Sequence, residues 1–188
     1  MAAVRLERLK QESTPEITVV WMAYPLLQGN MPGRRFDSYL ADAWARAGQE
    51  EPTLTFRPWP ESQNLPSSSL PALEAAKCAE LQGRDVFDRY HMALFHAFFE
   101  QCRDISSRDV LVSVAAEVGL DVARLGSDLD LGAGKSRVLA DYSEIRRSGC
   151  LGGVPTAIFA EDLRLEGAVP IELYRRAVKT VMERQSSE

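Results

Sequence analysis

Apolar side chains recur at helical spacing near both ends of the chain and along its middle. Residues 2–12 set apolar positions among charged ones, which predicts a short amphipathic helix. A longer apolar face runs through residues 86–99, over about four helical turns. Pro170 suits the first position of a last helix, because proline has no N–H to leave unbonded there. That helix is predicted to reach Met182.

Capping signals mark further helices in the middle of the chain. Ser106 followed by Asp109 resembles a capping box, and the helix it opens is predicted to end at Gly119. Asp121 is placed to cap another short helix. The remaining predicted helices span residues 36–47, 71–81 and 136–148, the last closed by Gly149.

Two regions have the composition of strands. Residues 17–24 are rich in β-branched and aromatic side chains and apolar almost throughout, which predicts a strand covered on both faces and stopped by Pro25. Residues 156–159 and 163–168 predict a hairpin, with a turn at 160–162.

The element order is therefore helix, strand, long helical insertion, hairpin and helix. One sheet with a helical subdomain between its halves unites these elements. We expect an α/β protein in which residues 1–60 and 150–188 form a sheet domain and residues 61–149 form the helical insertion.

Composition limits the partners. The 188 residues carry a net charge of −5, which argues against binding to nucleic acid or to an anionic membrane surface. The longest near-apolar run, residues 17–27, is too short to span a bilayer. The N-terminus lacks the apolar core of a signal peptide, so the expected location is the cytoplasm.

The cysteines predict neither disulfides nor zinc. Cys78, Cys102 and Cys150 are odd in number and far apart, which favours a reducing compartment. Cys78 and Cys102 fall in predicted helices, where we expect them to act as small apolar residues.

Two other patterns fail as functional motifs. Residues 132–136 contain Gly-Ala-Gly-Lys-Ser but lack the first glycine of a phosphate loop and a preceding strand, so we expect a flexible connection. His91 and His96 lie five residues apart on a helix and cannot chelate a metal together, so no metal site is predicted.

The segment from Gly149 to Phe159 is more informative. A proline at the mouth of a strand, after two glycines, is a place where a cis peptide bond is useful. Its sequence, Gly-Cys-Leu-Gly-Gly-Val-Pro-Thr-Ala-Ile-Phe, resembles the Gly-x-x-Gly-Val-Pro-Thr segment of the DsbA family, in which the proline is cis. Further stretches resemble the family in the same order, namely residues 70–77, 94–99, 104–105, 119–121 and 166–168.

The resemblance implies a thioredoxin fold with an inserted helical subdomain. It covers nearly the whole chain and is closest to the cytoplasmic branch of FrnE-like proteins and 2-hydroxychromene-2-carboxylate isomerases. In that family a Cys-Pro-x-Cys-Tyr motif opens the first helix, followed by a pattern similar to residues 5–9. Because Met1 stands about where that motif would end, the resemblance predicts that the first, central strand and both redox cysteines are missing from this truncated chain. The turn at residues 149–153 also has one extra residue.

The family's substrate-binding half is implied at Val154, Pro155 and Thr156. No catalytic residue is implied, because residues 1–3 contain neither a cysteine nor the serine of the glutathione-using relatives. Cys150 is the one thiol near the cis-proline segment, but it has no resolving partner and no helix N-terminus to lower its pKa.

Three functions remain open. The first is thiol–disulfide exchange on a protein or small-molecule thiol, in a longer product. The second is a glutathione-dependent isomerase or transferase reaction, with glutathione as the one cofactor that the resemblance allows. The third is a non-catalytic binding module. We expect the chain as given to lack dithiol activity, and its interrupted sheet to favour self-association.

Overall fold

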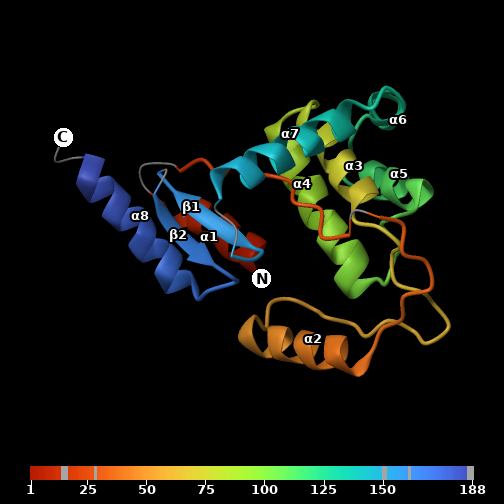
Figure 1. Ribbon diagram of the computed structural model, residues 1–188, viewed down its shortest axis with the longest axis horizontal. Helices are drawn as coiled ribbons and strands as arrows, with labels where there is room; N and C mark the ends of the chain where they lie inside the picture. Colours follow the sequence, from red (N-terminus) through yellow and green to blue (C-terminus); the bar gives the residue numbers. More distant parts are fainter. Residues whose placement is uncertain (14–16, 28, 150–151, 161, 186–188) are drawn as a thin grey trace. The chain divides into compact units, whose positions relative to one another are not determined.

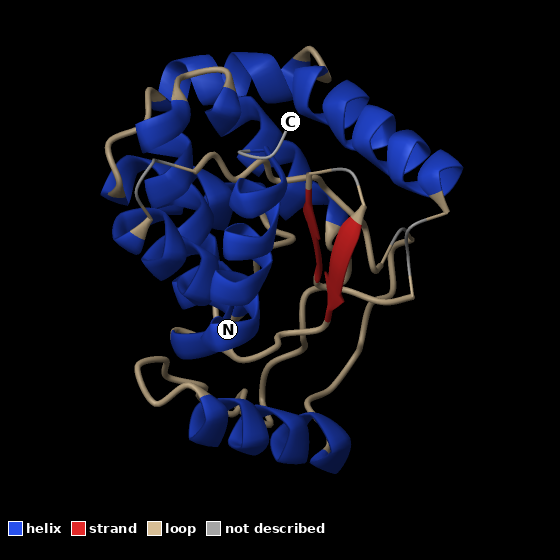
Figure 2. Ribbon diagram, turned by 90° about the vertical axis from the view of Figure 1, so that its left-hand side faces the viewer, coloured by secondary structure: helices blue, strands red, loops and turns tan. Residues whose placement is uncertain are grey.

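The chain folds into two compact units. The computed structural model describes residues 1–13, 17–27, 29–149, 152–160 and 162–185 (Figures 1 and 2). One unit combines Met1–Trp21 with Ile145–Glu188, and we call it the sheet unit. The other, Met22–Glu144, is the helical unit, and it is inserted within the sheet unit. An inserted helical subdomain is the arrangement that the sequence predicts.

The sheet unit consists of two helices and a hairpin. Helix α1 (Ala2–Glu12) packs against α8 (Ile171–Gln185), as the two predicted amphipathic helices require. Strand β1 (Thr156–Phe159) pairs antiparallel with β2 (Leu163–Glu166), which confirms the predicted hairpin. Figure 1 shows α8 running alongside this hairpin. The register places the first residue of β1 opposite the last residue of β2.

The core of the sheet unit lies between α1, α8 and one side of the hairpin. Leu6 and Leu9 from α1 meet Tyr174 from α8, and all three are buried. Arg5 is buried as well, and its guanidinium donates hydrogen bonds to two carbonyl oxygens just before α8. Partly buried apolar residues packed against this core are Ile17, Val19, Trp21, Ala157, Phe159, Leu165, Val169 and Val178.

Residues 17–24 do not form the strand that their composition predicts. In the described part of the chain the strands are β1 and β2, and they pair with each other. Ile17, Val19 and Trp21 still contact the core, whereas Val20 is 73% exposed. The segment is therefore covered on one side only. An apolar run shows that a segment can be buried on both faces. Strand formation also needs a neighbouring strand to pair with, and the run itself does not show whether one is present.

The helical unit contains the predicted helices with shifted ends. The helix predicted over residues 36–47 begins two residues later, at Ser38, and continues to Glu50. Among the described residues, no helix is both long and apolar enough to cross a bilayer. The helices are α2 (Ser38–Glu50), α3 (Leu70–Glu80), α4 (Arg84–Phe95), η1 (His96–Glu100), α5 (Arg108–Glu117), α6 (Val122–Asp130) and α7 (Ala133–Ser148).

Residues 133–136 of the glycine-rich stretch form the first turn of α7 rather than a flexible connection, and Gly132 lies in the turn before it. Gly134 lies in the first turn of α7 and is buried against α3. A Cβ atom there would collide with the Glu74 carbonyl oxygen and lie 2.8 Å from the Cys78 sulfur. Glycine at this position permits close packing of two helices, so a glycine that locally favours a loop lies inside a helix here.

The predicted long helix at residues 86–99 changes its winding near the end. Helix α4 continues into the π-helical turn η1, and the Gln101 N–H donates to the His96 carbonyl. Cys102 follows with a φ of 53°. It therefore lies outside a helix, although a helical position was predicted. Such a backbone turn is uncommon for a residue with a side chain.

The two predicted caps differ in outcome. Asp121 caps α6 as predicted, because its carboxylate accepts the Arg124 N–H. The capping box of Ser106 and Asp109 does not form, because the residue that precedes α5 as its N-cap is Ser107, and it makes no side-chain cap. The Ser106 oxygen instead accepts the Ser67 N–H, and its hydroxyl donates to the Asp104 carboxylate.

An aromatic cluster lies at the centre of one part of the helical unit. Trp44 and Trp59 are buried, and both contact Phe98 of η1. Phe99 packs edge-on against Phe98 and also contacts Trp44. Residues 1–60 were expected in the sheet domain, whereas Met22–Glu144 form the helical unit, and the aromatic cluster packs part of this segment against the helices.

Candidate functional site

The cis-proline segment opens β1. The peptide bond between Val154 and Pro155 is cis, the isomer that the family resemblance implies. The Gly167 N–H donates to the Pro155 carbonyl at 2.7 Å. The Thr156 hydroxyl donates to the Gly153 carbonyl at 2.6 Å. These two hydrogen bonds fix the segment to the hairpin.

The backbone before the proline is accessible. Gly152 and Gly153 are exposed, and the Val154 side chain is 40% exposed. A Cβ atom on Gly152 would overlap the Glu166 carboxylate, so any side chain there requires that carboxylate to move. Gly153 has open space where a side chain would be. This arrangement can offer main-chain N–H and C=O groups to an extended ligand.

The start of α1 carries no nucleophile. Residues 1–3 are Met, Ala and Ala, and both alanines are buried. The Arg5 N–H donates to the Met1 carbonyl at 3.1 Å, which closes the first helical turn. The Arg5 guanidinium anchors this turn through the carbonyls of Ala168 and Val169, at 2.6 and 2.9 Å.

The two described thiols are poorly suited to nucleophilic attack. Burial raises the pKa of the Cys78 thiol, and a hydrogen bond from the Gly134 backbone only partly opposes this. Burial also raises the pKa of Cys102, whose sulfur lies 3.6 Å from the Arg57 carbonyl oxygen. Because the thiolate is the nucleophile, both shifts reduce reactivity near neutral pH. Cys150 lies outside the described residues.

The two histidines lie apart and in different surroundings. His91 packs between the rings of Phe87 and Phe95, and burial lowers its pKa to about 4. His96 is exposed, with Nδ1 3.0 Å from the Glu100 carboxylate. Within the described ranges, no group of three or more His, Cys, Asp or Glu side chains is arranged to hold a metal ion.

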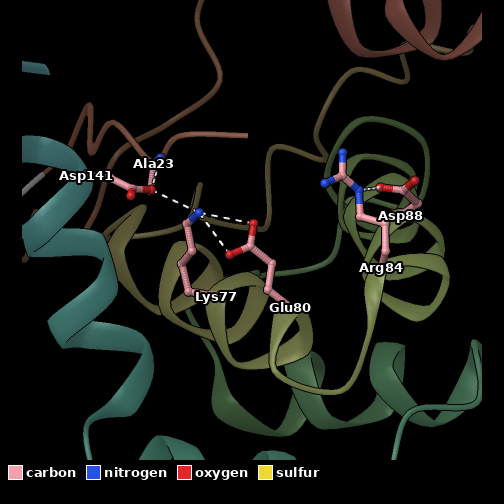
Figure 3. Close-up of polar contacts among 6 residues, drawn as sticks. All are labelled: Ala23, Lys77, Glu80, Arg84, Asp88 and Asp141. Carbon is pink, nitrogen blue, oxygen red and sulfur yellow. Dashed lines mark hydrogen bonds and ion pairs between the residues drawn. The ribbon is translucent and has the colours of Figure 1, made fainter. Parts of the chain in front are cut away.

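The helical unit contains a buried ionic network that the sequence did not predict. The Lys77 side chain is 9% exposed, and its ammonium lies between two carboxylates (Figure 3). The distances are 3.0 Å to Glu80 and 2.9 Å to Asp141. The same Asp141 oxygen accepts the Ala23 N–H at 2.7 Å. The network connects α3, α7 and the chain entering the helical unit, and its geometry indicates a structural role. The one feature of the sequence that indicated this network is the three-residue spacing between Lys77 and Glu80.

Comparison with known families agrees with this architecture. Residues 1–179 match the DSBA-like thioredoxin domain family. The ClpXP adapter protein SpxH from Halalkalibacterium halodurans is 27% identical over 172 residues, covering 85% of this chain and 54% of that protein. The chain therefore spans about half the length of this curated relative.

Solved structures share the fold at low sequence identity. A candidate protein disulfide isomerase from Nitrosomonas europaea superposes with a TM-score of 0.77 and 19% identity, covering 97% of this chain and 90% of that one. The cytosolic disulfide reductase DsbM from Pseudomonas aeruginosa superposes with a TM-score of 0.73 and 17% identity, covering 97% of this chain and 92% of that one. DsbM has also been solved with glutathione.

Proposed function

The chain belongs to the family of DSBA-like thioredoxin domains, and we propose that its sheet unit binds thiol or disulfide substrates at residues 153–156. The observation that carries this proposal is the exposed backbone of Gly153 and Val154, held beside β1 by the Gly167–Pro155 hydrogen bond. An extended substrate lying along this backbone gains main-chain hydrogen bonds without any change in the hairpin. The half-exposed Val154 side chain supplies an apolar contact.

The 188-residue polypeptide binds such substrates without exchanging disulfides through a dithiol. Exchange needs an attacking thiolate and a second thiol that resolves the mixed disulfide. The cysteines at positions 78, 102 and 150 have no such spacing in the sequence. Cys78 and Cys102 also have raised pKa values.

Glutathione is the small-molecule candidate. A fold neighbour, DsbM, has been solved with glutathione, and that tripeptide presents both a thiol and an extended main chain. The finer assignment within the family is to the cytoplasmic branch of FrnE-like proteins and 2-hydroxychromene-2-carboxylate isomerases, as the sequence resemblance suggests. A glutathione-dependent isomerase or transferase reaction is therefore the alternative function, and the cytoplasm is the proposed location.

Calorimetric titration with oxidised glutathione tests the binding function. We expect Val154→Asp to weaken binding by at least about tenfold, because it replaces an exposed apolar side chain with a carboxylate that repels an anionic ligand. Leu139→Asp is the matched control, since Leu139 on α7 is 53% exposed and lies in the other unit. Undetectable binding by the unmodified chain, or equal losses in both variants, would contradict the proposal.

A further inference from the structure

The two faces of the hairpin carry different kinds of side chain. Apolar residues that alternate along both strands pack against the core of the sheet unit. Successive side chains of a strand point to opposite faces, so the residues between them lie on the face turned away from the core. The register places Thr156 opposite Glu166 on that face. Ile158 lies there opposite Arg164. The charges on this face therefore belong to β2, and both charged residues are exposed.

The Glu166 side chain extends from this face toward the proposed substrate segment. A Cβ atom built on Gly152 would lie 2.6 Å from the Oε1 oxygen of Glu166 and 2.7 Å from its carboxyl carbon. The carboxylate therefore occupies the space that a side chain at position 152 would fill. Because Gly152 immediately precedes residues 153–156, a negative charge lies next to the backbone that we propose to bind substrate.

The Glu166 carboxylate has no partner in the part of the chain that the structure describes. It makes no hydrogen bond or ion pair with another described residue. Two other exposed carboxylates of the sheet unit, Asp162 and Glu172, pair with Arg184 and Arg175. Glu166 can therefore accept a cationic group of a ligand without first losing an ion pair of its own.

We propose that Glu166 determines the charge preference of residues 153–156, so that this segment favours thiols and disulfides whose cysteine is flanked by cationic residues. The inference rests on the binding function proposed above and adds the class of substrate. A lysine or arginine next to the cysteine of an extended ligand is attracted by the Glu166 carboxylate, whereas an acidic residue there is repelled. Glu166 is thus a specificity-determining residue that takes no part in bond making or breaking.

Arg164 is the charged group that opposes this preference. It lies on the same face as Glu166, two residues closer to the turn of the hairpin. That spacing places its backbone about 7 Å farther along the strand from the substrate segment. The interaction between exposed charges weakens with distance and with salt. The carboxylate that contacts Gly152 therefore has the larger effect on a ligand at residues 153–156.

Titration calorimetry with capped peptides of sequence X-Cys-X tests the preference, where X is lysine, glutamine or glutamate. Each cysteine carries a methyl disulfide, so the peptides share one main chain and one disulfide and differ in side-chain charge. At low ionic strength we expect the lysine peptide to bind at least about fivefold more tightly than the glutamate peptide. Added salt should reduce this ratio, because it screens exposed charges.

Variants of Glu166 identify the source of the preference. Glu166→Gln should reduce the ratio of the two affinities to about twofold or less, and Glu166→Lys should reverse it. Asp162→Asn is the matched control. It removes an equal charge from an exposed carboxylate at the opposite end of the same hairpin, so the ratio should remain that of the unmodified chain.

The outcomes separate this inference from the binding function. A ratio that ignores Glu166→Gln, or that falls equally in Asp162→Asn, would overturn the role of Glu166 while the binding function stands. Tighter binding of the glutamate peptide to the unmodified chain would overturn it too, because Arg164 would then outweigh Glu166. If even the uncharged glutamine peptide fails to bind, the binding function itself is wrong, and the charge preference falls with it.

Discussion

Lys77 on α3 and Asp141 on α7 form an ion pair of 2.9 Å in which both side chains are largely removed from solvent. The same carboxylate oxygen accepts the Ala23 N–H. A buried charge that loses its partner costs several kcal/mol, because neither water nor another group replaces the lost interaction. The pair therefore fixes the relative positions of two helices within the helical unit.

Asp141→Asn should destabilise the protein by about 3 kcal/mol, since it removes the charge facing Lys77. Lys77→Met should cost less than Lys77→Ala, because methionine fills the space left by the aliphatic stem. Urea unfolding followed by circular dichroism measures both. Arg184→Met is the control: its pair with Asp162 is exposed, and its loss should cost under about 1 kcal/mol. If the buried and the exposed pair gave equal losses in the free energy of unfolding, the structural role of the Lys77–Asp141 pair would be contradicted.

Gly134→Ala should destabilise the protein by about 1–3 kcal/mol, because the added methyl group overlaps the Glu74 carbonyl and crowds the Cys78 sulfur. Gly126→Ala in α6 is the matched control. Its Cβ would meet only the flexible Arg108 side chain, at 3.6 Å. Alanine there should be neutral or stabilising by up to about 1 kcal/mol, from its better helix propensity. The thermal unfolding temperature should fall for Gly134→Ala. For Gly126→Ala it should stay nearly unchanged or rise.

The elements with a clear apolar period were predictable from the sequence. Residues 2–12 and 171–182 place one apolar face toward a shared core, and both form helices. The hairpin was predictable because an apolar stretch and a stretch that alternates apolar and charged residues flank a short turn. Asp121 was predictable as a cap because its side chain bonds to a backbone group three residues away.

The features that depend on distant neighbours were not predictable. Gly134 has the local signature of a loop, and only the approach of α3 explains a glycine inside a helix. Lys77 and Glu80 have the spacing of a surface pair, whereas Asp141 joins them from 64 positions along the chain. At the candidate site, the resemblance located Val154 and Pro155, but the hydrogen bond from Gly167 that holds Pro155 beside β2 depends on the fold of the hairpin.

Burial lowers the pKa of His91 to about 4, from an ordinary value of 6.5. The folded state therefore binds a proton less readily than the unfolded state, and acid favours unfolding. This contribution to stability is complete above pH 6.5 and is lost as the pH falls from 6.5 to about 4, by roughly 3 kcal/mol.

Urea unfolding at several pH values measures this loss. His91→Phe keeps an aromatic ring beside Phe87 and Phe95 but cannot be protonated. The variant should therefore show a weaker pH dependence between 6.5 and about 4. His96→Phe is run in parallel as the same replacement at an exposed histidine of the next helical segment. Identical pH profiles for His91→Phe and the unmodified chain would contradict the prediction.

Insulin reduction with dithiothreitol measures dithiol oxidoreductase activity directly. We expect the 188-residue chain to show no rate above the dithiothreitol background, because none of its cysteines has a second cysteine at exchange spacing. The raised pKa values of Cys78 and Cys102 further reduce the thiolate fraction at neutral pH. Cys150→Ser and Cys102→Ser are run in parallel, so that any residual rate can be assigned to one thiol. Robust turnover that Cys150→Ser abolishes would show that a single cysteine near the cis-proline segment supports exchange, and the binding function proposed here would then be too narrow.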